Sequence, residues 1–421
     1  MDILERIFGK DADLLWEGNF QVLLLANLLA PLGSGLMSAV LNSLADPFAV
    51  STADLGLMIS AFTAPAVLII PITGVLADRF GRKPVLVAGL LTFGVGGVAI
   101  AFTNTFEVAL ALRLMQGVGY AGITPIIITS IGDLYAGTKE TTAQGLRFAC
   151  SGFAQTVFPI LSGILVVIAW QYPFFIYAIA FPVAVIVWLR FEEPAASLQS
   201  PANDGEQPTS RSGREQFAAV WDLISEPRVQ LAILVRGLPV MVWIGFLTYN
   251  SVFVERLMGG TPAEAGLLTA IGSITYAGAS SQAGRVTALF DDQLKPLLGA
   301  HVAMGIGFTA VVFSPSVAVA GPGIVLMCIG FGLALSLYRS IVTSLTDVTL
   351  RGSVVSLSES FGRLLSTVTP VLMGAIIALS TPIMGGTTAI RAAGIVIALI
   401  VGLGGVLTLL VVNATTEILR E

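Results

Sequence analysis

Hydrophobic residues run in long blocks along this chain, and polar residues fall mainly in short intervals between the blocks. A block of about twenty apolar residues is long enough to cross a hydrocarbon core of about 30 Å as an α-helix. The pattern therefore predicts an all-α membrane protein with twelve transmembrane helices. The blocks are 19–45, 53–76, 84–103, 106–132, 144–168, 172–191, 229–254, 263–284, 296–314, 320–344, 354–379 and 388–413.

Composition agrees with this pattern. Of the 421 residues, 55% are hydrophobic and 11% are charged, whereas soluble proteins contain about 25% charged residues. The mean hydropathy is +0.89. A lipid bilayer is therefore the expected surrounding of the chain.

The interval between the sixth and seventh blocks differs from the others. It reads "EEPAASLQSPANDGEQPTSRSGREQ" and is rich in Pro, Ser, Gly and charge, so it cannot bury enough apolar surface to fold alone. We interpret it as a linker between two six-helix bundles. The expected segments are a cytoplasmic N-terminal segment 1–18, a first bundle 19–191, a cytoplasmic linker 192–228, a second bundle 229–413 and a cytoplasmic tail 414–421.

The distribution of Lys and Arg predicts the orientation, because cytoplasmic loops hold an excess of these residues. If the N-terminus is cytoplasmic, all but three of the 21 cations lie in cytoplasmic segments or toward that side. The exceptions are Arg113, Arg256 and Arg391. We therefore expect a multi-pass protein of the cell (cytoplasmic) membrane with both termini in the cytoplasm.

The two halves of the chain resemble each other. "STADLGL" from Ser51 corresponds to "TPAEAGL" from Thr261, and each places a hydroxyl residue three positions before an acid, Asp54 or Glu264. That spacing predicts a capping box at the start of the second and eighth helices. Duplicated six-helix halves suit alternating access, in which two rigid bundles rock about a site held between them.

The stretch "GVLADRFGRKPVL", residues 74–86, concentrates charge between the second and third blocks. Its cations satisfy the positive-inside rule: Arg79, Arg82 and Lys83. Asp78 does not follow that rule, so we expect it to make a charge-assisted contact at a helix start that closes the cytoplasmic side. Gly74 and Gly81 would let helix ends approach closely.

This stretch resembles the signature loop of the major facilitator superfamily, and twelve helices in two halves fit the fold of that family along the whole chain. The resemblance implies that Asp78 contacts the start of the eleventh helix and that Arg82 pairs with Asp133 at the end of the fourth. The second half is less regular at this point. Its segment "AGRVTALFDDQLKP" has displaced acids but keeps Gly284, Lys295 and Pro296.

The fourth block contains "RLMQGVG", in which Arg113, Gln116 and Gly117 are similar to the R-x-x-Q-G pattern of proton-linked members of the family. An Arg inside a membrane helix normally faces protein or a water-filled cavity, which indicates a functional role. The alternative is an Arg near the outer end of the helix that snorkels and only anchors it.

The fifth block partly matches the Gly-Pro, Gly-Gly pattern of the drug:proton antiporter branch. Its segment "FPILSG" keeps Pro159 and Gly163, while Phe158 and Ser162 occupy the two other glycine positions. Pro159 would still bend the helix, and Ser162 is small enough for close packing.

The further intramembrane charges considered in the second half are Arg236, Arg339, Glu359 and Arg363. Glu359 and Arg363 are four residues apart, so they share one helix face and can form a pair. A pair that only fixes helix packing is the alternative to a functional one. If the three arginines and the one acid all line the transport cavity, the surplus of positive charge would attract an anion. Glu359 is the candidate proton carrier.

No other chemistry is indicated. The chain has no GxxxxGK[ST] motif and no cluster of His or Cys, since Cys150, Cys328 and His301 lie in separate helices. We therefore expect no catalytic residue, no metal and no cofactor, so the protein is not expected to be an enzyme. His301 is assigned no role.

The leading hypothesis is a secondary transporter that exports hydrophobic or amphipathic compounds in exchange for protons by alternating access. The alternative is a proton-coupled symporter or facilitator of a small anionic metabolite, and a third hypothesis is a receptor or scaffold that does not transport. The expected partners are a small-molecule substrate, protons and the bilayer, with no nucleic acid. We expect a monomer.

Overall fold

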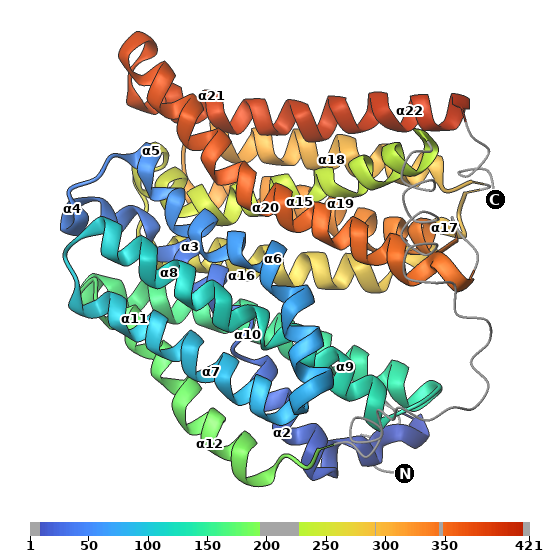
Figure 1. Cartoon of the computed structure of the whole chain (residues 1–421). Coiled ribbons are helices and arrows are strands. Elements are labelled where there is room, and N and C mark those ends of the chain that lie inside the picture. The colour runs from blue at the N-terminus through green and yellow to red at the C-terminus, as the bar shows by residue number, and fades with distance from the viewer. Residues whose placement is uncertain (1–8, 194–226, 291, 345–347, 416–421) are drawn as a thin grey trace. The chain divides into compact units, whose positions relative to one another are not determined.

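The computed structural model describes residues 9–193, 227–290, 292–344 and 348–415, and every regular element within them is a helix (Figure 1). The chain divides into two compact units. Unit 1 contains Met1–Ala202 and Thr261–Ala270, and unit 2 contains Asn203–Gly260 and Ile271–Glu421.

Unit 1 contains six helical spans, several of them built from consecutive helices. Their helices are α2 (Gly18–Asn27), α3 (Leu32–Val40) and α4 (Ala45–Phe48); α5 (Thr52–Leu55) and α6 (Leu57–Phe80); α7 (Arg82–Ala99); α8 (Phe106–Ala121) and α9 (Thr124–Leu134); α10 (Thr138–Ile168); and α11 (Tyr172–Phe175) and α12 (Ala180–Arg190).

Unit 2 contains the remaining helices, apart from the first part of α16, which is counted with unit 1. They are α15 (Pro227–Val252), α16 (Pro262–Ser281), α17 (Ala283–Thr287), α18 (Leu294–Phe313), α19 (Val317–Ser344), α20 (Val348–Met384), α21 (Gly386–Leu399) and α22 (Gly405–Thr415). A π-helical turn over Ile400–Gly404 joins α21 to α22.

Eleven helical segments of the described residues are long and apolar enough to cross a membrane. The eighth expected helix is α16, which has 20 residues but carries Ser and Thr side chains that lower its hydropathy. With α16 included, the helices match the expected fold of twelve transmembrane helices in two six-helix bundles, which is confirmed.

Both predicted capping boxes are present. The Ser51 amide donates to Asp54 at 3.3 Å, and the Ser51 side chain caps the first turn of α5 in return. The Thr261 amide donates to Glu264 at 2.7 Å, and the Glu264 amide donates to the Thr261 hydroxyl at 3.3 Å. These contacts satisfy amide groups that have no partner within the helix.

Glycines allow equivalent helix pairs to pack closely in both units. A Cβ placed on Gly119 of α8 would lie 2.7 Å from the Gly89 carbonyl of α7. In unit 2, a Cβ on Gly307 of α18 would lie 2.7 Å from the Gly323 carbonyl of α19. Small residues at such crossings increase van der Waals contact, which stabilises helix pairs in a bilayer where there is little hydrophobic drive.

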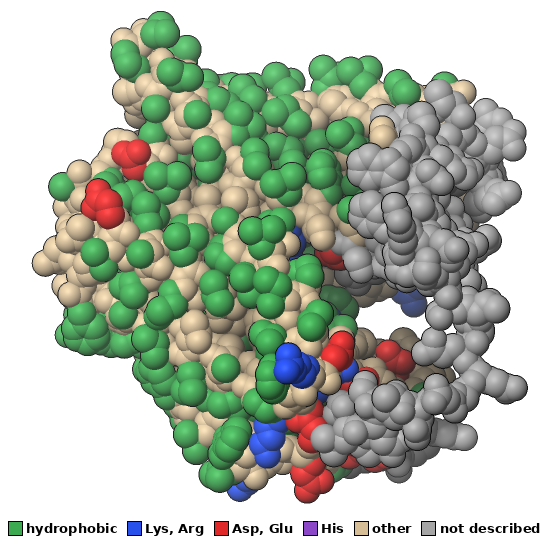
Figure 2. Space-filling view, viewed as in Figure 1, with side chains coloured by type: hydrophobic (Ala, Val, Ile, Leu, Met, Phe, Trp, Pro, Cys, Tyr) green, Lys and Arg blue, Asp and Glu red, His purple; other side chains and the backbone are tan. Residues whose placement is uncertain are grey.

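The helix surfaces are largely apolar. Figure 2 shows hydrophobic side chains over most of the visible helix faces, and the Lys and Arg side chains of unit 1 gather at one end of its helices. Large exposed hydrophobic side chains include Leu68, Val95, Phe102 and Trp188 in unit 1. Such a surface is suited to lipid contact along the helices and to water at their ends.

We predict that Gly119→Ala lowers the thermal unfolding midpoint of the detergent-purified protein by several degrees. The added methyl group has to push apart the α7 and α8 backbones, and overpacking of this kind costs about 1–3 kcal/mol. Gly145→Ala is the matched control, because a Cβ at Gly145 meets no atom within 4 Å. Equal midpoints for the two variants would contradict the close packing of α7 on α8.

Candidate functional site

The loop between α6 and α7 is organised around Arg82, the first residue of α7. Its Nη1 pairs with Asp78 near the end of α6, and its Nε donates to Asp133 in α9 at 3.1 Å. The side chain of Arg82 is only 12% exposed. One guanidinium therefore links three helices, and the contact with Asp133 is the one that the resemblance implies.

The expected contact of Asp78 with the start of the eleventh helix stays a prediction. The side chains of residues 342–356 lie outside the described residues. Within unit 1, the described partner of Asp78 is Arg82 on the next helix.

Glu193 caps the start of α7. Its carboxylate accepts hydrogen bonds from the backbone amides of Arg82 and Lys83, the latter at 2.9 Å. These first-turn amides have no partner within the helix, and the helix N-terminus favours a negative charge. Gly81 makes this contact possible, because its φ is +95° and a Cβ there would lie 3.1 Å from the Glu193 carboxylate.

The remaining residues of the loop have different surroundings. An added Cβ on Gly74 would meet no atom of the described residues within 4 Å, and the expected close approach of helix ends at Gly74 stays a prediction. Arg79 is exposed, with its guanidinium 5.3 Å from the ring centre of Phe80. The ammonium of Lys83 lies 5.7 Å from the ring centre of Trp188.

A second polar cluster ties the start of the described chain to α10. Lys139 pairs with Glu17 at 2.5 Å and with Asp13 at 3.2 Å, and the Tyr135 hydroxyl donates to Glu17 at 2.7 Å. Burial and the hydrogen bond to Glu17 raise the pKa of Tyr135, so this hydroxyl remains a donor. The cluster fixes α2 to the segment that follows α9.

Arg113 of α8 is completely buried. Its Nη2 donates to the Gly33 carbonyl at 2.7 Å, its Nε donates to the Met58 carbonyl at 2.9 Å, and its Nη1 donates to Gln116 at 2.5 Å. The guanidinium also lies 4.6 Å from the ring centre of Phe62. Because protein encloses the charge, the alternative of a snorkelling anchor does not fit.

The partners of Arg113 in the described part of the chain include two carbonyls, one amide oxygen, the Phe62 ring and the Tyr177 hydroxyl, and none of these is a carboxylate. A buried guanidinium without a carboxylate partner is costly. Gly117, the third residue of the motif, faces α6, where a Cβ would overlap the backbone of Phe62. The motif therefore holds a positive charge at a tight contact between α6 and α8.

The expected bend residues lie on α10, which runs without interruption through the buried Pro159. The Ser162 hydroxyl lies 3.1 Å from the Leu36 carbonyl and 3.0 Å from the Pro159 carbonyl. A Cβ on Gly163 would overlap the backbone at Pro262, a residue of the same unit. Small side chains at these two positions therefore permit close helix contacts.

In unit 2, Arg236 of α15 pairs with Glu359 of α20. The Arg236 side chain is 8% exposed and that of Glu359 is 48% exposed, so one partner is buried and the other is accessible. The expected pair of Glu359 with Arg363 on the same helix stays a prediction. The side chain of Arg339 lies outside the described residues.

His301 of α18 is buried and fully hydrogen-bonded. Its Nδ1 lies 2.7 Å from the Val401 carbonyl, and its Nε2 lies 2.7 Å from the Tyr338 hydroxyl. The carbonyl requires Nδ1 to be the donor, so Nε2 accepts from the tyrosine. Gly405 leaves room for the ring, since a Cβ there would overlap the imidazole.

Sequence reasoning missed two residues of this region. Glu193 was counted with the linker, although an acid directly after the sixth helix could have indicated a contact with a nearby helix start. Arg147 lies inside the fifth expected block and is 5% exposed, with its Nε donating to Gln144 at 2.8 Å. The signal for Arg147 was the same as for Arg113, a cation within an apolar block.

Comparison with known proteins extends these observations. The sequence model of the family described as Major Facilitator Superfamily matches residues 23–370. The "Bacillibactin exporter" of Bacillus subtilis (strain 168) is 35% identical over 154 residues, which span 35% of this chain and only 38% of that protein. The "Tetracycline resistance protein, class B" of Escherichia coli is 24% identical over 381 residues, which span 87% of this chain and 90% of that protein.

A solved structure has a similar fold. It is a bacterial homolog of the human lysosomal transporter Spinster in an inward-facing and occupied conformation. It superimposes with a TM-score of 0.77 at 17% identity and covers 94% of this chain and 96% of its own.

We predict that Glu193→Ala accelerates amide hydrogen exchange in the first turn of α7, because the amides of Arg82 and Lys83 lose their acceptor. Loss of a helix cap of this kind costs about 1 kcal/mol. Hydrogen exchange of peptides that cover residues 78–90, followed by mass spectrometry, measures the effect. Glu192→Ala is the matched control, because the described hydrogen bonds of Glu192 use its backbone. Equal exchange in both variants would rule out the cap.

Proposed function

This chain belongs to the major facilitator superfamily, and from that premise we propose that it exports hydrophobic or amphipathic compounds in exchange for protons. As a member of the family it is a multi-pass membrane protein that transports a small molecule, and it is not an enzyme. The proposal concerns the coupling ion, the direction and the class of substrate.

The observation that carries the proposal is the pair of Arg236 and Glu359. It lies on two helices of unit 2 that are long and apolar enough to span the membrane, where ionisable groups mark ion and proton pathways. Glu359 is accessible while Arg236 is buried. When Glu359 takes up a proton its charge is lost, and the buried guanidinium is left without its carboxylate, which is unfavourable.

Protonation of Glu359 is therefore a step that changes the preferred arrangement of α15 against α20. A transporter couples two solutes when binding of one shifts the equilibrium that the other depends on. We propose that proton binding to Glu359 and substrate binding are linked in this way.

The names of two relatives support export and a link to drug resistance. One is named a bacillibactin exporter and the other a tetracycline resistance protein. Transport of an anionic metabolite has less support, because Arg236, one of three arginines that could attract an anion, already faces Glu359. Proton flux in proteoliposomes, measured with small organic anions as a separate set of compounds, tests this alternative.

The buried Arg113 has a separate role in the proposal. Its carbonyl and amide partners lie on α3, α6 and α8, so its charge holds these three helices together. A permanent positive charge at this place would also repel a proton that moves through unit 1. Proton movement is therefore assigned to unit 2.

We further propose that the chain acts as a monomer in the cytoplasmic membrane with both termini in the cytoplasm. The support is the gathering of Lys and Arg at the end of unit 1 where α6 ends, α7 begins and α12 ends. At this end, Arg82 with Asp78 and Asp133 would form a rigid corner that moves as one piece during alternating access.

We predict that proteoliposomes of the purified protein release protons from an acidic lumen when lipophilic cations such as tetraphenylphosphonium are added outside. A pH-sensitive dye inside the vesicles measures the flux, and protein-free vesicles give the background. Small organic anions should leave the signal at that background. A response to the anions alone would contradict the proposed export of amphipathic compounds and would indicate anion transport.

We predict that Glu359→Gln reduces substrate-evoked proton flux to the level of protein-free vesicles while substrate binding persists, because the amide cannot exchange a proton. Binding is measured separately by tryptophan fluorescence of the detergent-purified variant. Glu107→Gln is the control, since Glu107 is an exposed acid in the first turn of α8. Proton flux at the parental rate in Glu359→Gln would remove Glu359 from the coupling step.

A further inference from the structure

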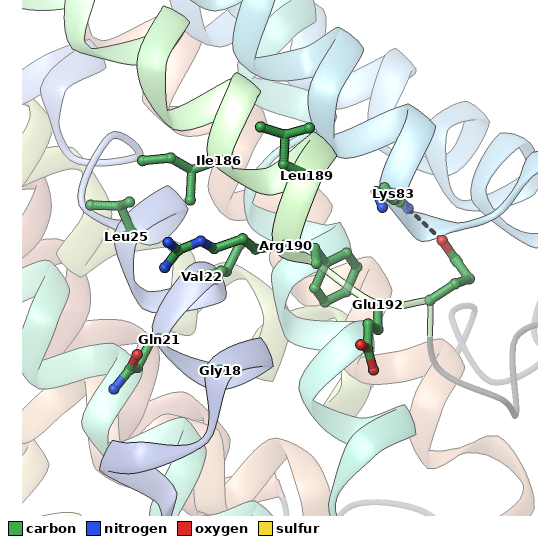
Figure 3. Close-up of a pocket in the computed structure, with 11 residues that line it drawn as sticks. Gly18, Gln21, Val22, Leu25, Lys83, Ile186, Leu189, Arg190 and Glu192 are labelled. Carbon is green, nitrogen blue, oxygen red and sulfur yellow. Dashed lines mark hydrogen bonds between the residues drawn. The ribbon is translucent and has the colours of Figure 1, made fainter.

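A cavity lies at one end of unit 1, beside the signature loop. Its volume is about 820 Å³, and it is lined by the start of α2, the start of α7 and the end of α12 with the residues that follow it. Its walls are largely apolar: Val22, Leu25, Ile186 and Leu189. Two cations, Lys83 and Arg190, line the same cavity (Figure 3).

Arg190 is the cation that distinguishes this cavity. In Figure 3 its side chain extends from α12 toward Val22 and Leu25 and away from Glu192. The described ion pairs of unit 1 use Arg82 and Lys139, and none of them includes Arg190. A guanidinium presents five donors in a planar fork that matches a phosphate group.

The acids of the cavity leave this guanidinium available. Glu193 uses its carboxylate on the first amides of α7. Glu192 is exposed, and in Figure 3 the Arg190 side chain points away from it. Lys83 adds a second positive charge, with its ammonium near the Trp188 ring.

We propose that this cavity binds the phosphate headgroup of an anionic membrane lipid, with Arg190 as the principal phosphate ligand. The position fits a lipid, because the membrane-length span Tyr172–Arg190, of which α12 is the last part, ends at Arg190 and therefore reaches the headgroup level there. Trp188 is 57% exposed and Leu189 is 73% exposed. An exposed Trp near the end of a span is typical of the membrane interface.

The apolar walls favour a lipid over a soluble phosphate. A free phosphate would use only the cations and leave Leu25, Ile186 and Leu189 facing water, whereas an acyl chain or glycerol backbone would cover them. The inference does not depend on which substrate the protein carries. It rests only on the position of the cavity at the end of a membrane span.

The test is a lipid titration of the purified full-length protein, with binding followed by native mass spectrometry. Dioleoylphosphatidylglycerol is the anionic probe and dioleoylphosphatidylcholine is the neutral comparison. We expect the parent to prefer phosphatidylglycerol. Arg190→Gln should weaken phosphatidylglycerol binding about fivefold or more, as expected for loss of a charge-assisted contact, with phosphatidylcholine binding unchanged.

Two further variants distinguish a specific lipid-binding site from nonspecific attraction of the lipid to surface charge. Ile186→Trp keeps Arg190 but fills the cavity, so it should weaken phosphatidylglycerol binding as well. Arg285→Gln removes an exposed cation of unit 2 whose described contact is Gln282, and it should bind lipid like the parent. Equal affinities in Arg190→Gln and Arg285→Gln would overturn the proposal.

A competition experiment distinguishes a lipid headgroup from a soluble phosphate compound as the ligand. Inorganic phosphate or glycerol phosphate is added to the phosphatidylglycerol complex at the concentration of the lipid. We expect no displacement, because neither compound covers the apolar walls. Displacement at equal concentration would overturn the assignment to a lipid.

Discussion

The structure depends on one constraint, which is that a charge inside a membrane-spanning helix finds no water to solvate it. Two such charges in the described residues, Arg113 and Arg236, have internal partners of different kinds. Arg113 is surrounded by carbonyls, an amide and a ring, whereas Arg236 has a carboxylate. These two solutions have different consequences, because a carbonyl cannot change its charge and a carboxylate can. Arg113 is therefore suited to a permanent structural role, and the pair in unit 2 is suited to switching.

The same constraint explains why polar groups at the helix ends are so closely organised. At the start of α7, Arg82 pairs with two carboxylates. Glu193 accepts hydrogen bonds from two backbone amides of the same turn. Between the ends, packing replaces polar contact, and glycines in α8 and α18 bring backbones together. The pairs α7 with α8 and α18 with α19 use this device in both halves, as expected for a duplicated chain. The polar corner around Arg82 has no equally complete copy in the sequence of the second half.

The sequence predicted the features that depend on neighbouring residues. Hydrophobic blocks predicted the helices because a membrane span needs a fixed length of apolar chain, and three-residue spacing predicted the capping boxes at Ser51 and Thr261. Contacts between distant residues could not be predicted this way. Glu193 and Arg236 find partners 110 and 123 residues away, and no local spacing encodes such pairs.

The cap on α7 has a consequence for the order in which the protein is made. Lys83 precedes its acceptor, Glu193, by 110 residues. During synthesis the third helix therefore emerges before its cap, and its first amides lack the Glu193 carboxylate until the sixth helix has been translated. The signature loop can reach its final geometry only when the first six helices are all present. Glu193 thus marks the completion of the first half of the chain.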